Sequence, residues 1–244
     1  LDYVVRTFAS VGDTVAIAAP TYDNFRAYVE SVGASAVQIL NPDVFQSNIS
    51  LLVESIPANV KIIYVVNPNN PTGIYYSLDE LEILANTFPE ALLIVDEAYA
   101  EFAGVSAIQL VKTHSNILVS RSFSKAFALA SFRIGYVVSN PENIFYINKI
   151  RNGKNVPMLS QIAAIAALRD NTYMKEYVTR VQENALHLCS SLAALGFYVK
   201  GTSANWILLK DQSSREIKRF LEERNIFVRD LSHLPGMENY LRIT

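Results

Sequence analysis

The sequence has very little cysteine, because Cys189 is the only one in 244 residues. One thiol cannot form an internal disulfide, and chains without disulfides are typical of reducing compartments, so we predict a cytoplasmic protein. The sequence also lacks any apolar run near the roughly 20 residues that span a bilayer. Its first residues do not have the basic and then apolar layout of a signal peptide. We therefore expect neither a membrane span nor a targeting signal.

An excess of positive charge is also missing. The 21 Lys and Arg residues stand against 23 Asp and Glu residues, which gives a net charge of −2. This balance does not predict binding to nucleic acid or to an anionic membrane, and it favours a small-molecule partner. No G-x-G-x-x-G segment is present, so a dehydrogenase with the usual dinucleotide-binding loop is disfavoured.

The sequence does contain short β-branched runs that alternate with helical patterns, which predicts an α/β fold with a largely parallel sheet. We assign this pattern to a larger domain at residues 1–160. The expected strands are 14–19, 35–40, 61–66, 92–95, 116–120 and 134–138, and the expected helices are 23–32, 78–88 and 141–151.

A smaller α/β domain is expected after it, at residues 161–244 together with an interdomain helix. Apolar residues recur at helical spacing through residues 160–195, in two helices that separate near Asp170 and end at Gly196. The later expected elements are strands at 197–199, 206–209, 226–228 and 240–243 and a helix at 214–224. The sequence opens as if in mid-helix and ends inside a strand, so we expect an N-terminal part of the first domain and a C-terminal end of the second to be missing.

Polar segments follow two of the predicted strands, at the edge where open α/β sheets hold their ligands. Residues 67–73 read N-P-N-N-P-T-G, which breaks regular structure and leaves amide side chains facing a cleft. Asp96 emerges from a very apolar strand, where a carboxylate is costly to ionise unless a cation such as a pyridinium nitrogen meets it. Tyr99, three residues further on, could donate a hydrogen bond to the phenolic oxygen of a cofactor. Taken singly, the first segment could be only a turn, Asp96 a helix cap and Tyr99 a packed core residue.

A lysine stands inside the apolar stretch from Ser120 to Arg133. Burial destabilises an ammonium group, which would leave Lys125 as a neutral amine able to attack an aldehyde and form a Schiff base. The hydroxyls of Ser122 and Ser124 and the cation of Arg133 could bind a dianionic phosphate. A single lysine of this kind could equally reach solvent with its charged end.

An arginine lies in the predicted last strand. A guanidinium fork on a strand can bind a carboxylate through two parallel hydrogen bonds, so Arg242 is a candidate ligand for a substrate acid. Taken by itself it could be one half of a surface ion pair.

Together these segments resemble the aspartate-aminotransferase superfamily of enzymes that depend on pyridoxal phosphate (PLP), and within it the histidinol-phosphate aminotransferase branch. The resemblance covers nearly the whole chain. Its specific parts are N-P-N-N-P-T-G, D-E-A-Y and S-x-S-K-A-F-A-L-A with an arginine eight residues after the lysine, and its weaker parts are N-W-I-L and L-R-I-T. It implies PLP fold type I, which is a mostly parallel seven-stranded sheet covered by helices with a smaller C-terminal α/β domain, and a homodimer.

The resemblance also implies a role for each motif residue. Lys125 would hold the cofactor and move the proton between the substrate and the cofactor. Asp96 would keep the pyridine nitrogen protonated. The other implied ligands are Tyr22 stacked on the ring, Asn70 and Tyr99 on the phenolic oxygen, Ser122, Ser124 and Arg133 on the phosphate, and Arg242 on the substrate. Asn205 would either touch the substrate or only shape its pocket.

The predicted reaction is transfer of an amino group between a substrate such as histidinol phosphate and the 2-oxoglutarate/glutamate pair, as part of histidine biosynthesis. Residues 130–133 read A-S-F-R where the branch usually has A-G-L-R, and residues 153–156 read G-K-N-V where it often has P-Y-N-V, so the substrate stays open. The alternatives are an aminotransferase of a surface-polysaccharide or cofactor pathway, or a PLP decarboxylase acting on a phosphorylated amino acid. A non-catalytic binding protein of the same fold is a third possibility, although no DNA-binding segment is visible.

Overall fold

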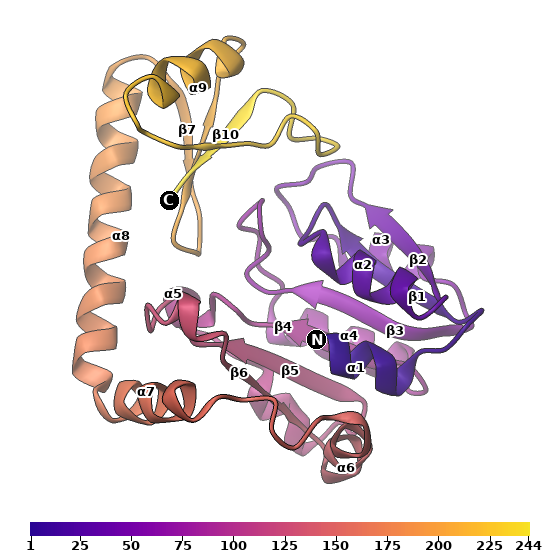
Figure 1. Cartoon of the computed structure of the whole chain (residues 1–244). Helices are drawn as coiled ribbons and strands as arrows, with labels where there is room; N and C mark the ends of the chain where they lie inside the picture. The colour runs from indigo at the N-terminus through magenta and orange to yellow at the C-terminus, as the bar shows by residue number, and fades with distance from the viewer.

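A six-stranded sheet forms the centre of the first part of the chain in the computed structural model, which describes all of residues 1–244 (Figure 1). The strands lie in the order β2-β1-β3-β4-β5-β6, and every neighbouring pair is parallel except β5 and β6. Their bounds are β1 Thr14–Ala19, β2 Ser35–Leu40, β3 Val60–Val66, β4 Leu92–Asp96, β5 Ile117–Ser122 and β6 Gly135–Ser139. The prediction of an α/β fold with a mostly parallel sheet is confirmed.

Residues 1–244 build six strands of this sheet, one fewer than the seven that the resemblance implies for the whole fold. Residues 1–139 contribute only the six segments just given, and every later strand pairs within a second sheet. A strand joins a sheet through backbone hydrogen bonds to a neighbour, and none of the later strands makes such bonds to β2 or β6.

Helices cover both faces of this sheet, because the central strands are apolar on both sides. Their bounds are α1 Asp2–Phe8, α2 Asn24–Ser31, α3 Ile49–Ser55, α4 Leu78–Thr87, α5 Ala100–Ala103 and α6 Pro141–Ile150, with 3₁₀ turns at Ala107–Lys112 and Ala130–Phe132. Neither the short α3 nor α5 is predicted, because seven and four residues give too little of a helical repeat. In α3 the Asn48 side chain accepts a hydrogen bond from the Leu51 amide and so caps the helix.

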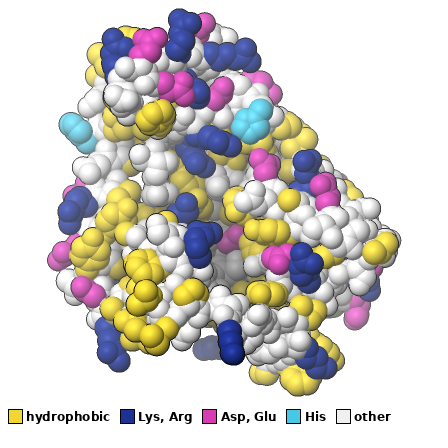
Figure 2. Space-filling model, viewed as in Figure 1, with side chains coloured by type: hydrophobic (Ala, Val, Ile, Leu, Met, Phe, Trp, Pro, Cys, Tyr) yellow, Lys and Arg dark blue, Asp and Glu magenta, His cyan; other side chains and the backbone are white.

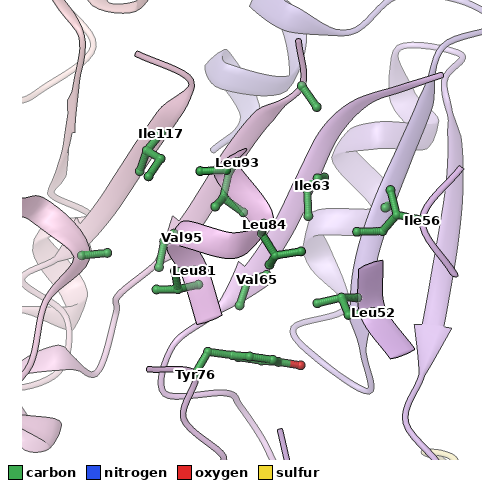
Figure 3. Packing of buried hydrophobic residues seen from close by; sticks show 14 of the residues in the cluster. Leu52, Ile56, Ile63, Val65, Tyr76, Leu81, Leu84, Leu93, Val95 and Ile117 are labelled. Atoms are coloured by element: carbon green, nitrogen blue, oxygen red, sulfur yellow. The ribbon is translucent and has the colours of Figure 1, made fainter. Parts of the chain in front are cut away.

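Alternate residues of a strand point to opposite faces of the sheet, and β3 shows this clearly. Ile63 and Val65 pack with α3 and α4 in one core cluster, which Figure 3 shows from close by. Ile62 and Tyr64 pack with α1, α2 and α6 in a cluster on the other face. Each fully buried Ile or Leu stabilises the fold by roughly 1.5–3 kcal/mol. These two apolar layers fix the register of the strands, and thereby the positions of the residues that follow them.

Two helices lead from the first sheet to the second. They are α7 Met158–Arg169 and α8 Asn171–Ala194, and α8 runs along one side of the molecule (Figure 1). Gly196 follows α8 with a φ of +91°, as expected of a glycine that ends a helix. No helix of the structure is both long enough and apolar enough to cross a membrane.

The second sheet is antiparallel and has the strand order β7-β8-β10-β9. Its elements are β7 Tyr198–Gly201, β8 Ile207–Lys210, α9 Ser214–Glu222, β9 Arg229–Asp230 and β10 Tyr240–Ile243. The strand expected at 226–228 is wrong, because Ile226 and Phe227 are exposed and pairing with β10 begins only at Arg229. Without a buried face, an apolar run is not held in a sheet. The boundary between domains at residues 160 and 161 stays a prediction.

Candidate active site

A cavity of about 750 Å³ opens where the carboxyl ends of β3, β4 and β5 face the second sheet. Figure 2 shows the hollow on this face, with Lys and Arg side chains at its rim. Nine of the ten residues singled out from the sequence line the cavity: Tyr22, Asn70, Asp96, Tyr99, Ser122, Ser124, Lys125, Arg133 and Arg242. The tenth, Asn205, is half-buried in the loop before β8 and lines neither this cavity nor its outer extension.

Asp96 is the last residue of β4 and is only 8% exposed. Its carboxylate accepts hydrogen bonds from the Tyr64 hydroxyl at 2.8 Å and from the Ser120 hydroxyl at 3.0 Å. Burial raises the pKa of Asp96, and these hydrogen bonds act against the rise. No ion pair of the chain involves Asp96. A buried acid on a cavity wall that forms no ion pair is suited to bind a cationic ligand.

Tyr64 and Ser120 are not among the site residues predicted from the sequence, although the strand register contains a signal for them. Ser120 of β5 lies directly opposite Asp96 of β4, and Val66 of β3 lies opposite Asp96 on its other side. Tyr64 is two residues before Val66 and therefore points to the same face of the sheet. Tyr64 and Ser120 each carry a hydroxyl within a largely aliphatic strand that neighbours the strand of Asp96. This pattern in the sequence would have predicted both as partners of the acid.

The turn at residues 67–73 has two structural asparagines and one that faces the cavity. The Asn67 side chain donates to the Tyr76 carbonyl and accepts from the Tyr76 amide, while Asn69 donates to the Pro20 carbonyl. The expectation that the amides of this segment face a cleft is therefore correct only for Asn70. Its Oδ1 accepts a hydrogen bond of 2.6 Å from Nη1 of Arg242, which leaves its amide N–H groups as donors.

Lys125 lies in the loop that connects β5 to β6. The two ends of this loop approach each other closely at Gly135. An added Cβ there would lie 2.5 Å from the carbonyl oxygen of Arg121, so only glycine fits. Lys125 is half-buried, with its Nζ 5.2 Å from the centre of the Tyr99 ring. Burial lowers the pKa of Lys125, and the positive charges of Arg242 and Arg133 lower it further. The amine is thus neutral at a lower pH than an ordinary lysine.

The same loop carries the two hydroxyls and the guanidinium predicted to bind a phosphate. The Ser124 amide donates to the Ser122 hydroxyl at 3.1 Å, which turns the chain after β5. Arg133 has a left-handed backbone with a φ of +50°, and its Nη1 donates to the Ala130 carbonyl at 2.9 Å. These contacts leave other N–H groups of the Arg133 guanidinium free to face the cavity.

A buried ion-pair network ties the ends of β4 and β5 together beneath the site. Arg121 contacts Glu97 at 2.8 Å and Glu101 at 2.7 Å, and the Ser106 hydroxyl donates to Glu97 at 2.7 Å. Glu97 is 1% exposed, and burial raises its pKa. Removing one partner from such a buried network typically costs about 3–5 kcal/mol. We assign these residues to the scaffold that holds Asp96 and Lys125.

An outer extension of about 320 Å³ shares Tyr22, Asn70 and Arg242 with the main cavity. It adds Arg229 and His233, which are not predicted from the sequence. Arg229 of β9 is paired directly with Arg242 of β10 in the antiparallel register, so the two side chains share one face of the sheet. Opposed like charges are destabilising, and an anion between them would relieve the repulsion.

The donor set of the main cavity fits PLP. The buried acid without a cation matches the pyridine nitrogen, the half-buried amine matches the aldehyde, and the Ser122, Ser124 and Arg133 group matches the phosphate. Together with the sheet topology, this set defines the class of protein, an enzyme of fold type I that uses PLP.

Comparison with known proteins gives the same class. The family described as aminotransferase class I and II matches residues 1–244. A dihydroxyacetone phosphate transaminase of Campylobacter jejuni is 42% identical over 236 residues, covering 95% of this chain and 64% of that protein. A histidinol-phosphate aminotransferase of Geotalea daltonii is 34% identical and covers 100% of this chain and 69% of that protein.

A solved structure extends the comparison. The histidinol-phosphate aminotransferase of Sinorhizobium meliloti in complex with PLP superposes with a TM-score of 0.91 at 26% identity, covering 100% of this chain and 68% of that one. The chain thus spans about two thirds of the length of the relatives that it matches. It belongs to the aminotransferase class I and II family, and the prediction of a PLP-dependent aminotransferase is confirmed.

Proposed function

We propose that this protein transfers an amino group between glutamate and a small substrate that carries a phosphate group. The observation that carries the transferase assignment is that Lys125, with its lowered pKa, and Asp96, a buried acid that forms no ion pair, line one cavity. Bound PLP supplies an aldehyde that reacts with amines and a ring that accepts the electrons released from the substrate's Cα–H bond.

The first task of the chain is to hold the reacting groups and move a proton. Lys125 would hold the cofactor through its neutral amine and, when that amine is free, would act as the base that moves the proton at the substrate's α-carbon. A lowered pKa suits it to both steps, because a protonated amine can neither attack nor act as a base. Arg133, Ser122 and Ser124 bind the phosphate and so keep the reacting carbon beside Lys125.

Two residues tune the cofactor ring. Asp96 would hold the pyridine nitrogen in its protonated form, and the Tyr64 and Ser120 hydroxyls donate the hydrogen bonds that keep this carboxylate in place. Burial raises the pKa of Tyr99 to about 12, so its hydroxyl keeps its proton at neutral pH and donates to the phenolic oxygen. The Asn70 amide donates to the same oxygen, because Arg242 occupies its carbonyl side.

The substrate class is inferred from the outer extension. Nε of Arg242 is buried and has no hydrogen-bond partner, and the Arg229 guanidinium shares its face of the sheet. Two adjacent guanidinium groups are better suited to bind a phosphate monoester than to bind a single carboxylate. Dihydroxyacetone phosphate and histidinol phosphate, the substrates in the names of the two relatives, both carry such a group. Histidinol phosphate is our first candidate, and the 42% identity of the other relative favours dihydroxyacetone phosphate as the second.

The test is the absorbance of the PLP-loaded protein. We expect glutamate to replace the visible band of the lysine-bound cofactor by the ultraviolet band of its amino form, and a phosphorylated ketone to restore it. If neither glutamate, histidinol phosphate nor any other amine changes the spectrum, the transferase proposal is wrong although PLP is bound.

Replacing Arg229 by glutamine tests the phosphate preference. A charge-assisted hydrogen bond contributes about 1.5–3 kcal/mol, so kcat/KM for a phosphorylated substrate is expected to fall by roughly 10–150-fold. The value for the same substrate without its phosphate should change less than about threefold. Lys210→Gln, which removes an exposed cation of the same sheet that contacts Tyr240, is the matched control. Equal losses for both substrates would contradict a phosphate contact at Arg229.

We also propose that two copies of the chain pair through α6 and α7. These helices expose large apolar side chains, with Phe145, Met158, Leu159 and Ile162 each more than half exposed. Large exposed apolar side chains that gather along a helix are typical of an interface. Light scattering is expected to give twice the 27.2 kDa chain mass, and Leu159→Glu to give the single chain, whereas Leu195→Glu at the end of α8 should leave the mass doubled. A monomer before any substitution would refute the pairing.

The pathway and the compartment also stay proposals. Histidine biosynthesis follows only if histidinol phosphate is the substrate. A cytoplasmic location is supported by the free thiol of Cys189, since reducing compartments keep such thiols unpaired.

A further inference from the structure

Trp206 lies between the two sheets and is 2% exposed. It immediately precedes β8 and belongs to the core cluster that contains Tyr99 and Ala126 of the first sheet's loops and Leu208 of the second sheet. It does not line the main cavity. It is also the only tryptophan of the chain.

Three contacts connect Trp206 to residues that do line the cavity. Its ring N–H donates a 2.9 Å hydrogen bond to the Pro71 carbonyl, directly after Asn70. Its ring meets the Tyr99 ring edge-on, with 4.7 Å between the centroids. The Arg242 guanidinium lies 5.4 Å from its ring centre, within the range of a cation–π contact.

These contacts close a ring of interactions, because Arg242 also donates to Asn70. The same segments also meet where Gly73 lies against Thr202, so closely that an added Cβ on Gly73 would overlap the Thr202 side chain. The Thr202 hydroxyl in turn donates to the backbone carbonyl of Trp206. The loop before β8 is therefore fixed against the turn at residues 67–73 at two points. Trp206 is the side chain that contacts both Pro71 and Arg242.

We propose that Trp206 is a positioning residue that holds the Asn70 amide and the Arg242 guanidinium in the arrangement in which they contact the cofactor's phenolic oxygen and the substrate's anionic group. The inference rests on the proposed function of those two residues. Its physical basis is that Pro71 and Asn70 belong to one turn. Loss of the hydrogen bond between the Trp206 ring and the Pro71 carbonyl therefore displaces the Asn70 side chain. The expected consequence is electronic as well as structural, because a donor withdrawn from the phenolic oxygen changes the acidity of the lysine-bound cofactor.

The test is the pH midpoint of the visible absorbance band of the PLP-loaded protein. Asn70 donates to the phenolic oxygen most strongly when that oxygen is charged and the bond to Lys125 is unprotonated. Losing this donor favours the protonated form, so the midpoint should rise. For Trp206→Phe, which keeps an aromatic ring but removes the N–H, we expect a rise of about 0.5–1 pH unit, the size of one hydrogen bond. A midpoint within 0.2 unit of the unaltered protein would overturn the proposal.

Two further proteins sharpen the experiment. Because the chain has one tryptophan, supplying the analogue in which sulfur replaces the ring N–H changes only this site and keeps its shape, so it serves if the phenylalanine variant fails to fold. Leu209→Val trims a buried side chain of β8 that makes none of these contacts, and its midpoint should not move. A midpoint that moves equally in Leu209→Val would mean that Trp206 acts only through general stability. The visible band requires bound PLP but no turnover, so its pH midpoint can be measured in an inactive protein. If the midpoint shifts as expected but no amino transfer is detected, the proposed function is refuted and this inference stands.

Discussion

Replacement of Lys125 by alanine is expected to abolish both the visible absorbance band of bound PLP and all measurable amino transfer. The variant loses the amine that bonds to the aldehyde and the base that moves the proton, and each of these contributes substantially. Proton transfer by a positioned side chain is worth about 10²–10⁴-fold by itself, so we expect kcat/KM to fall by at least about 10⁴-fold. Absorbance spectra and steady-state rates measure the two losses separately.

The control is Lys112→Ala, which removes an exposed lysine at the end of the 3₁₀ turn Ala107–Lys112 that does not line the cavity. Its band and its rates should match the unaltered protein. A visible band that persists in Lys125→Ala would mean that another lysine holds the cofactor. Added methylamine should restore part of the lost rate in Lys125→Ala, since a small amine can enter the space left by the side chain and take up the proton.

The lowered pKa of Lys125 gives this reaction a defined pH dependence. Only the neutral amine attacks the aldehyde, so the rate at which cofactor-free protein captures PLP should rise with pH and level off below the ordinary lysine value of about 10.4. Burial is the main cause of the shift, with Arg242 and Arg133 adding to it. A plateau at or above the ordinary value would show that the amine is not desolvated in solution.

Asp96→Asn is expected to give the second large effect. The amide cannot stabilise a protonated pyridine nitrogen, and losing one partner of a buried charge pair costs about 3–5 kcal/mol. We therefore expect kcat/KM to fall by roughly 10²–10⁴-fold, with the visible band still present because Lys125 is unchanged. Ser120→Ala, which removes one of the two hydroxyls that bind Asp96, should lose far less. Equal activity of Asp96→Asn and the unaltered protein would exclude the pyridinium contact.

The same substitution should stabilise the cofactor-free protein. Burial raises the pKa of Asp96 in the folded chain, so the folded state holds a proton at pH values where the unfolded chain has lost it. Stability from this group is therefore complete below the unfolded pKa and is lost as pH rises through the folded pKa. Asparagine carries no proton that must be kept or lost, so it removes this pH-dependent cost at pH 7, and each kcal/mol recovered raises Tm by about 2–4 °C. A lower Tm for cofactor-free Asp96→Asn at pH 7 would contradict this.

Much of the fold could be predicted from the sequence because its signals are local. The strands Thr14–Ala19, Ser35–Leu40 and Tyr240–Ile243 have the bounds expected from their β-branched runs, and two helices separate near Asp170 as their spacing predicts. Both signals repeat within a few residues, so neighbouring positions are sufficient to identify them. Failures occurred where the local repeat was short, as in the seven residues of α3, or where no buried face supported it, as at 226–228.

What the sequence determined by itself is the alternating pattern that builds the α/β sheet and the set of residues whose chemistry suits PLP, including Lys125, Asp96 and Arg242. What only the tertiary structure decided is which groups support them. Tyr64 and Asp96 are 32 residues apart, Arg242 and Asn70 are 172 apart, and Trp206 and Pro71 are 135 apart. Such partners meet only after the strands have taken their register and the second sheet has packed on the first, because a side chain's local pattern carries no information about what lies across a folded core.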